Sequence, residues 1–285
     1  MNDSLPLGAV DAADFERRFG GLRRLYGADG AQRVFDAHVM VVGIGGVGSW
    51  AAEALGRSGV GHLTLVDLDH VGESNTNRQI HALDGQYGKA KVDAMAERVR
   101  QINPAAQVLG MDDFVTPQNW VATVEAARAR CPQRPFAVID ACDQMSAKVA
   151  MAAWALQTQA LFVSAGAAGG KRRGDLVELA DIADTTHDPL LAQLRYRLRK
   201  HHGAAREGAI GVRGVFSREN VVAPAVCEDG ASGDGSLNCH GYGSSVAVTA
   251  TFGLCAAGWV MDCLAQGEVF LKKNARTSKS RKNTL

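Results

Sequence analysis

The stretch HVMVVGIGGVGSWAAEALGRSGVGHLTLVD, from His38 to Asp67, decides the fold. It opens with a β-branched apolar run at 38–42 that leads into closely spaced glycines. An alanine-rich segment with helical spacing follows and ends near Gly59, and a second apolar run at 62–67 ends in an acid. This order predicts a strand, a tight turn, a helix and a second strand. Such a unit has parallel strands joined by a right-handed crossover.

The same alternation continues along the chain. Helices are predicted at 89–102, 118–130, 148–159 and 188–202, and strands at 107–111, 136–140, 161–164 and 211–217. The regularity falls off after Gly170, and a glycine-rich loop is predicted at 228–245. The series predicts an α/β fold, a doubly wound, mostly parallel, Rossmann-like sheet with helices on both faces and a less regular C-terminal part.

The composition of the 285 residues is that of a globular enzyme. The net charge is +1, and 46% of the residues are hydrophobic and 21% charged, which excludes a disordered chain, a collagen-like fibre and a globally basic histone-like protein. We expect a basic arm with helices at 1–37, a nucleotide-binding part at 38–170, a substrate and dimer part at 171–271, and a basic, disordered tail at 272–285.

The cysteines and the N-terminus favour a cytoplasmic protein. Six cysteines include no CxxC pair and no plausible zinc set, so reduced thiols and no zinc are expected. The N-terminus is acidic where a secretory signal needs positive charge and an apolar run. The uncharged segment 244–261 has the length of a membrane span, but its many small residues favour a buried helix. Membrane association through this segment is the alternative.

The turn Gly43-Ile44-Gly45-Gly46-Val47-Gly48 satisfies G-x-G-x-x-G between a strand and a helix. Its glycines permit a tight turn, and the free N–H groups of the helix favour an anionic phosphate. Asp67 follows the last glycine by 67 − 48 = 19 residues and is placed to bind a ribose. These features predict a nucleotide site, and an NAD-binding dehydrogenase or sensor would share them.

The residues that follow favour a triphosphate over a dinucleotide. The amides of Asn75 and Asn77, the guanidinium of Arg78 and the ammonium groups of Lys89 and Lys91 follow Asp67 in the sequence. Such cations are needed when negative charge moves onto a leaving pyrophosphate. The nucleotide-binding candidates are Gly43, Gly45, Gly46, Gly48, Asp67, Asp69, Asn75, Arg78 and Lys91. Asp140 and Asp143 follow a predicted strand, where a Mg²⁺ ion could be held.

The series GIGGVG, DLDHVGESNTNRQ, GKAK and DACD resembles the adenylating enzymes of the ThiF, MoeB and HesA family, relatives of the ubiquitin-activating enzymes. The family pattern spans residues 38–165. Further segments resemble members of the family that modify tRNA: RFGGLRRLYG at 18–27, NRQIHAL at 77–83, RQINP at 100–104, DDFVTP at 112–117, HDPL at 187–190 and TATFG at 249–253.

The resemblance implies a role for each candidate residue. The glycines would bracket the phosphates of ATP, Asp67 would bind the ribose, and Asn75 would contact the phosphates. The implied catalytic residues are Arg78, Lys91, Asp143 as the magnesium ligand, and Arg18. Family members are homodimers in which an N-terminal arginine reaches the partner's site, and Arg24 is the other candidate for that arginine.

The resemblance also implies an activity, the ATP-dependent dehydration of threonylcarbamoyladenosine beside the anticodon of tRNA. The basic helix at 188–202 and the basic tail could meet tRNA phosphates. Cys239 matches a cysteine considered for sulfur relay with a cysteine-desulfurase or sulfur-acceptor system, although side chains adjacent in sequence, such as that of His240, seldom face each other. The alternative substrate is a ubiquitin-like sulfur-carrier protein, but the chain lacks the paired CxxC motifs of enzymes that adenylate such carriers.

Overall fold

The structure is a computed structural model that describes residues 12–222 and 242–267. Within these residues, seven strands form one sheet in the order β3-β2-β1-β4-β5-β7-β6. The strands are β1 (His38–Val42), β2 (His62–Val66), β3 (Gln107–Met111), β4 (Phe136–Asp140), β5 (Leu161–Ala165), β6 (Val177–Asp181) and β7 (Arg213–Ser217). All neighbours pair in parallel except β6 and β7, so the predicted mostly parallel, doubly wound sheet is confirmed.

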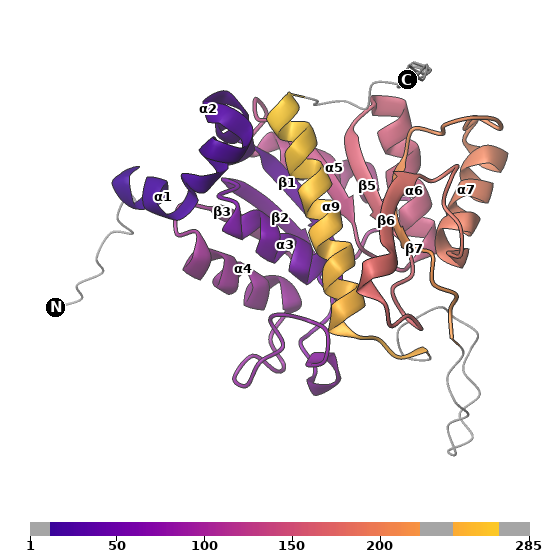
Figure 1. The fold of residues 1–285 in the computed structure, drawn as a ribbon, viewed down its shortest axis with the longest axis horizontal. Coiled ribbons are helices and arrows are strands. Elements are labelled where there is room, and N and C mark those ends of the chain that lie inside the picture. Colours follow the sequence, from indigo (N-terminus) through magenta and orange to yellow (C-terminus); the bar gives the residue numbers. More distant parts are fainter. Residues whose placement is uncertain (1–11, 223–241, 268–285) are drawn as a thin grey trace, which may run out of the picture.

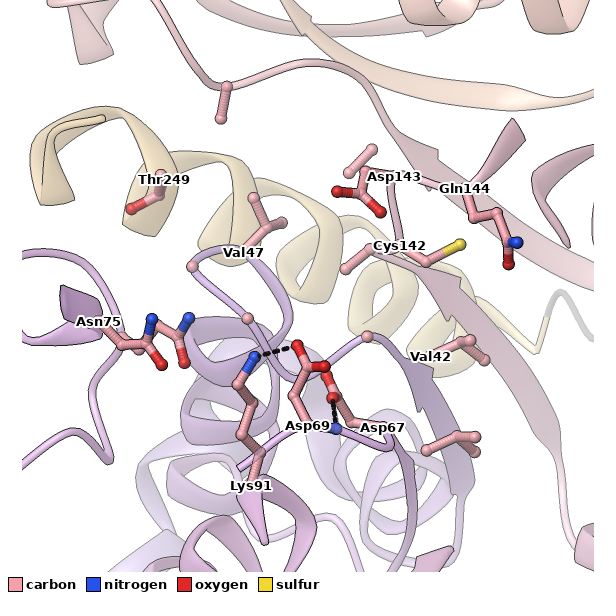
Figure 2. Close-up of a pocket in the computed structure, with 18 of the residues that line it drawn as sticks. Val42, Val47, Asp67, Asp69, Asn75, Lys91, Cys142, Asp143, Gln144 and Thr249 are labelled. Atoms are coloured by element: carbon pink, nitrogen blue, oxygen red, sulfur yellow. Dashed lines mark hydrogen bonds and ion pairs between the residues drawn. The ribbon is translucent and has the colours of Figure 1, made fainter. Parts of the chain in front are cut away.

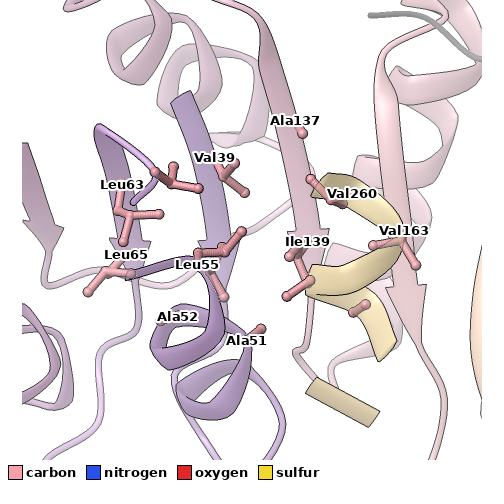
Figure 3. Packing of buried hydrophobic residues seen from close by; sticks show 14 of the residues in the cluster. Val39, Ala51, Ala52, Leu55, Leu63, Leu65, Ala137, Ile139, Val163 and Val260 are labelled. Carbon is pink, nitrogen blue, oxygen red and sulfur yellow. The ribbon is translucent and has the colours of Figure 1, made fainter. Parts of the chain in front are cut away.

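Helices cover both faces of the sheet (Figure 1). The helices are α1 (Ala12–Phe19), α2 (Gly21–Phe35), α3 (Gly48–Arg57), α4 (Lys91–Ile102), α5 (Trp120–Ala129), α6 (Met145–Thr158), α7 (Pro189–His201) and α9 (Val246–Gln266), with short turns η1 (Glu73–Asn75) and η2 (Gly174–Leu176). The helices α3, α4 and α9 share one core with the sheet, and α5, α6 and α7 share the other. Leu55 of α3 and Val260 of α9 pack against Val39 and Ile139 of the strands (Figure 3).

The central strands are buried along their whole length because helices cover both of their faces. Strands β1, β2, β4 and β5 bury all five of their residues, whereas the edge strand β3 leaves residues partly exposed. Continuous burial of this kind explains why the strands appear as short apolar runs in the sequence.

The uncharged segment forms α9, which crosses the sheet beside α3 (Figure 1). With 21 residues and a mean hydropathy of 1.5, α9 is long and apolar enough to cross a membrane. Its buried residues recur with helical spacing, as at Val248, Phe252, Ala256 and Val260, and they face the sheet. The structure therefore gives α9 a place in the protein core, as the buried-helix interpretation predicts.

Strand β6 was not expected from the sequence. It has one neighbour, β7, and four of its five residues are only partly buried, so the sequence carries too short an apolar run to indicate a strand. The predicted glycine-rich loop falls largely, and the predicted tail entirely, outside the described residues.

Candidate functional site

A cavity of about 610 Å³ lies at the carboxyl ends of the strands, where the strand order reverses between β1 and β4. Ligands of open α/β sheets bind at such a switch point because the two neighbouring loops diverge there. The loops after β1, β2, β4 and β5 line the cavity, together with the starts of α4 and α9. Figure 2 shows the pocket with the side chains that enter it.

The glycine turn has two parts with different physical requirements. A Cβ on Gly48 would lie 1.7 Å from the carbonyl oxygen of Gly43, and Gly43 has a φ of +87° with the Ala141 carbonyl 2.8 Å from its own Cβ position. These glycines are needed for the turn itself. A Cβ on Gly45 would meet no atom closer than 3.9 Å, so Gly45 faces open space in the pocket. That space is where a phosphate could approach the backbone.

Asp67 is fixed by the turn at the end of β2. One carboxylate oxygen accepts a hydrogen bond from the Ile44 N–H at 2.5 Å, and the other accepts from the Asp69 N–H at 2.9 Å. Burial raises the pKa of Asp67, while the charge of Lys91 and both backbone donors act in the opposite direction. The carboxylate therefore lines the pocket in a set orientation, where a ribose could donate to it.

Lys91 begins α4 and forms an ion pair with Asp69, with 2.7 Å between Nζ and Oδ2 (Figure 2). The lysine side chain is 7% exposed and the aspartate side chain 72% exposed. The ammonium group is thus held in the pocket wall, and a bound phosphate can share it with a carboxylate that stays mostly in water.

Arg78 supplies a second cation. Its guanidinium donates to the Ser74 carbonyl at 2.7 Å and to Asn77 Oδ1 at 2.9 Å, and within the described residues it has no carboxylate partner. The Trp50 indole N–H donates to the Arg78 carbonyl at 2.9 Å and holds the backbone. Asn75 also lines the pocket, with Oδ1 accepting from the Gly72 N–H at 3.0 Å. This wall carries positive charge that is open to an anion.

The two candidate magnesium ligands differ, and the expectation for Asp140 is wrong. Its carboxylate is fully buried and bonded to Lys148 Nζ at 2.9 Å, to Ser164 Oγ at 2.6 Å and to Cys142. Asp143 is exposed, lines the pocket, and makes no hydrogen bond or ion pair within the described chain. Strand β4 ends at Asp140, so only the later carboxylate projects into the cavity.

Asp143 fits a magnesium ion held together with phosphates. Residues 12–222 and 242–267 contain no group of three or more His, Cys, Asp or Glu side chains placed to hold a metal alone. Mg²⁺ usually takes one or two protein carboxylates and completes its shell with phosphate oxygens and water. One free carboxylate beside an anion pocket meets that requirement.

Cys142 lines the pocket but is not suited to be a nucleophile. Its thiol donates to Asp140 Oδ1 at 3.0 Å, and burial together with the Asp140 charge raises its pKa well above the usual range. A thiol that stays protonated reacts poorly. Cys239, the other candidate thiol, lies outside the described residues.

The N-terminal arginines lie away from this pocket. Arg18 pairs with Asp14 at 2.8 Å and donates to the carbonyl of Ile102 at 3.3 Å, at the far end of α4 from Lys91. Eleven residues of helix separate those ends by about 16 Å. Arg24 is exposed on α2 and does not line the pocket either. Neither N-terminal arginine therefore reaches the pocket of its own copy within the described chain.

Four further pocket residues lie within the motif segments of the sequence but are not among the predicted site residues. Leu68 and Phe114 expose about half of their side chains at the ends of β2 and β3, at 48% and 50%. Gln79 and Thr249 are buried, and Gln79 Oε1 and Thr249 Oγ1 have no hydrogen-bond partner within the described residues. Leu68 and Phe114 form an apolar pair beside Asp67 that suits the adenine base of a nucleotide. They come from the ends of two different strands, so the order of the strands in the sheet brings them together.

The predicted basic helix is α7, and its cations have different surroundings. Arg195 donates to the carbonyls of Ile182 and Thr185, so it holds a loop. Lys200 is exposed and lies over the Tyr196 ring at 5.4 Å. Any contact of α7 with an anionic partner would therefore use its outer residues.

The comparisons with known proteins agree with this geometry. Residues 19–283 match the model of the ThiF family. The tRNA threonylcarbamoyladenosine dehydratase of Escherichia coli (strain K12) is 45% identical over 259 residues, which cover 88% of this chain and 94% of that protein. The crystal structure of the E. coli dehydratase in complex with ATP has a TM-score of 0.79 and 41% identity, and covers 91% of this chain and 98% of that chain. Its complex with AMP gives the same TM-score at 42% identity.

Proposed function

This chain belongs to the ThiF family, and from that premise we propose that it catalyses the ATP-dependent dehydration of threonylcarbamoyladenosine in tRNA to the cyclic form. The observation that carries the proposal is one pocket that joins an open glycine turn, a fixed carboxylate and two cations. Relatives of similar length that carry this activity in their names, with ATP and AMP bound in solved complexes, support the choice of substrates.

The pocket residues would activate the threonyl carboxylate. ATP lies with its ribose on Asp67 and its phosphates along the turn at 43–48. A carboxylate oxygen of the substrate attacks the α-phosphorus, and the acyl-adenylate forms as pyrophosphate leaves. Arg78 and Lys91 stabilise the charge that develops on the phosphates, where preorganised cations lower the barrier most.

Ring closure needs no nucleophile from the protein. The carbamoyl group of the same substrate attacks the activated carbonyl, and AMP leaves with an oxygen of the original carboxylate. An intramolecular group held near its target has a very high effective concentration. The raised pKa of Cys142 agrees with a reaction that uses no thiol at this position.

We further propose that Mg²⁺ accompanies ATP and that Asp143 holds it together with phosphate oxygens. The ion, when bound, neutralises phosphate charge during the transfer. The free and exposed carboxylate of Asp143 supports this assignment.

The active unit is proposed to be a homodimer in which Arg18 of one copy enters the pocket of the other. Two observations support this. Arg18 lies at the far end of α4 from its own pocket. In addition, Leu254 of α9 and Leu25 of α2 expose 48% and 73% of their side chains, and these two helices pack together. A second copy could cover such exposed apolar side chains.

The remaining partners and the location are also proposals. We assign the outer cations of α7 and the basic tail to tRNA binding, and the protein to the cytoplasm. A sulfur-transfer partner acting through Cys239 stays a prediction, and so does membrane association through 244–261.

Nucleoside mass spectrometry tests the function directly. Substrate tRNA is incubated with the protein, ATP and magnesium, and its nucleosides are analysed. The proposal predicts that threonylcarbamoyladenosine loses the mass of one water, and that the loss requires ATP. NADH in place of ATP is the control for the dinucleotide alternative. Unchanged nucleosides with a folded, ATP-binding protein would contradict the proposed substrate.

A further inference from the structure

A second cavity, of about 260 Å³, lies at the amino ends of β1 and β2, the opposite end of the sheet from the nucleotide pocket. It is formed by the first residues of these strands, the C-terminal part of α4, and the loop that joins α5 to β4. The side chains that matter for its chemistry are His38, His62, Arg100, Arg130 and Cys131. The proposed function uses none of them.

A cysteine and a histidine are paired in this cavity. Cys131 Sγ lies 3.1 Å from His62 Nδ1, which is hydrogen-bond distance for a thiol and an imidazole. Cys131 is partly exposed, whereas His62 is 8% exposed and held by the strand. A thiol with a base at this distance can lose its proton without releasing it to bulk water.

Positive charge surrounds the pair. Arg100 and Arg130 line the cavity, and Arg134 follows in the same loop, where it pairs with Asp36. Burial lowers the pKa of His62, and the charge of Arg134 lowers it further while Asp36 opposes the shift. The imidazole is therefore neutral at neutral pH, and the arginines that line the cavity favour an anionic ligand.

His38 gives an independent sign of a ligand. It is 2% exposed, its Nε2 pairs with Thr64 Oγ1 at 2.8 Å, and its Nδ1 has no hydrogen-bond partner within the described residues. Burial, assisted by His62 and nearby arginines, lowers its pKa to about 4, so this ring is neutral too. A buried polar atom is normally satisfied, and a molecule in the cavity could satisfy this one.

The other described cysteines are less reactive by their surroundings. Burial raises the pKa of Cys142 and of Cys255. Cys263 is 6% exposed. We therefore expect a disulfide reagent to react with Cys131 before the other described cysteines, because of the surroundings of Cys131.

We propose that Cys131 is a site of thiol–disulfide exchange with small anionic disulfides, with His62 as the proton acceptor and Arg130 as a contact for the anion. The thiol proton passes to His62, and the thiolate attacks one sulfur of the incoming disulfide. The bond from Cys131 to that sulfur forms as the old disulfide bond breaks. The other half leaves as a thiolate, which takes the proton from His62.

Exchange kinetics with dithiobis-nitrobenzoate, a dianionic disulfide, test the site. The folded protein carries Ser at Cys227 and Cys239, so that only the four described cysteines can react. We expect one fast phase of one equivalent, about tenfold faster than the next thiol. Peptide mass spectrometry should place the adduct on Cys131, and Cys131→Ser should remove the fast phase while ATP-dependent turnover is retained.

The roles of the neighbours need separate variants. His62→Gln should slow the fast phase about tenfold if His62 takes the proton. Arg130→Ala changes an exposed side chain and should slow exchange with the anionic disulfide, but not with uncharged hydroxyethyl disulfide. A fast phase that maps to another cysteine, or equal rates for all thiols, would overturn the site. If Arg130→Ala slowed exchange with both disulfides equally, the proposed contact between Arg130 and the anion would be overturned. This comparison does not depend on whether His62→Gln folds.

Discussion

Gly45 and Gly48 belong to one turn but meet different physical needs. A methyl group on Gly48 would overlap the Gly43 carbonyl, whereas one on Gly45 would point into the pocket. We predict that Gly48→Ala destabilises the protein by about 3 kcal/mol or more, because the backbone must move. Gly45→Ala should keep the melting temperature and weaken ATP binding instead. Thermal unfolding and ATP titration of both variants check this, and equal stability losses would contradict it.

Arg78 and Asp143 are predicted to act on the reaction and not on the fold. Among the described residues, the Arg78 guanidinium donates only to Ser74 and Asn77, and Asp143 has no partner, so alanine at either position should leave the fold intact. Turnover should fall by about a hundredfold or more for Arg78→Ala, since a charge aimed at the phosphates is lost. Steady-state kinetics measure the effect, and Arg218→Ala, which changes an exposed arginine away from the pocket, is the control. Near-normal turnover in either variant would refute its assigned role.

At the level of single residues, sequence spacing indicated several polar side chains and glycines that line the pocket, and their roles stay predictions. The turn at 43–48 and Asp67 follow strands and Lys91 begins a helix, so parallel topology brings them together, and the loop after β2 adds Arg78. It did not separate Asp140 from Asp143, because the spacing does not show where β4 ends and its last carboxylate meets a buried lysine. Phe114 was missed because an aromatic side chain after an edge strand has no characteristic spacing.

At the scale of elements, one buried ion pair joins β4 to α6. Lys148 and Asp140 are both fully buried, and although burial alone would lower the pKa of Lys148, the Asp140 charge raises it. Removing one partner leaves an unpaired buried charge, so Lys148→Met should destabilise the protein by about 3–5 kcal/mol. Denaturant unfolding measures this loss. The double variant Lys148→Met with Asp140→Leu should recover part of it, and an unaltered single variant would disprove the coupling.

Strands and helices with a clear apolar pattern were predictable from the sequence. The strand β6 at the edge of the sheet was not. The strands β1, β2, β4 and β5 are continuous apolar runs, and Gly59, with a φ of +73°, closes α3 where expected. Strand β6 escaped prediction because its one partner lies later in the chain and half of its surface stays in water. The composition of α9 suits both a core and a membrane, and only its contacts with α3 and the sheet show where it packs.

For the whole molecule, two buried histidines make stability depend on pH. Burial, together with nearby positive charges, lowers the pKa of His38 and of His81 from 6.5 to about 4; the charges are those of Lys91 and Arg98 in the case of His81. The unfolded chain takes up protons near pH 6.5 and the folded chain does not. The stability is therefore complete above pH 6.5 and is lost as the pH falls from 6.5 to about 4.

Each histidine contributes at most about 3 kcal/mol to this loss. His81→Leu should flatten the fall in unfolding free energy between these pH values, while His201→Ala, at an exposed position, should not. Urea unfolding at a series of pH values gives the slopes. The same slope in His81→Leu as in the unmodified protein would exclude the effect.

The proposed dimer gives a test in which two inactive variants restore each other. Arg18→Ala lacks the arginine that crosses, and Asp143→Ala lacks the magnesium ligand, so each homodimer should be inactive. Mixed dimers hold one site with both groups, and after random exchange about a quarter of all sites should be active. Turnover of mixtures over a range of ratios measures this. Mixtures that stay inactive although the subunits exchange would contradict the shared site.

If ATP activates the threonyl carboxylate as an acyl-adenylate, one oxygen atom of that carboxylate must end up in AMP, and isotope labelling can follow it. Substrate tRNA carries the heavy oxygen isotope in that carboxylate, and the products of one turnover are analysed by mass spectrometry. We expect one labelled oxygen to leave in AMP, because the carbonyl keeps the other oxygen when the ring closes. Cyclic product formed with unlabelled AMP would contradict activation by adenylation.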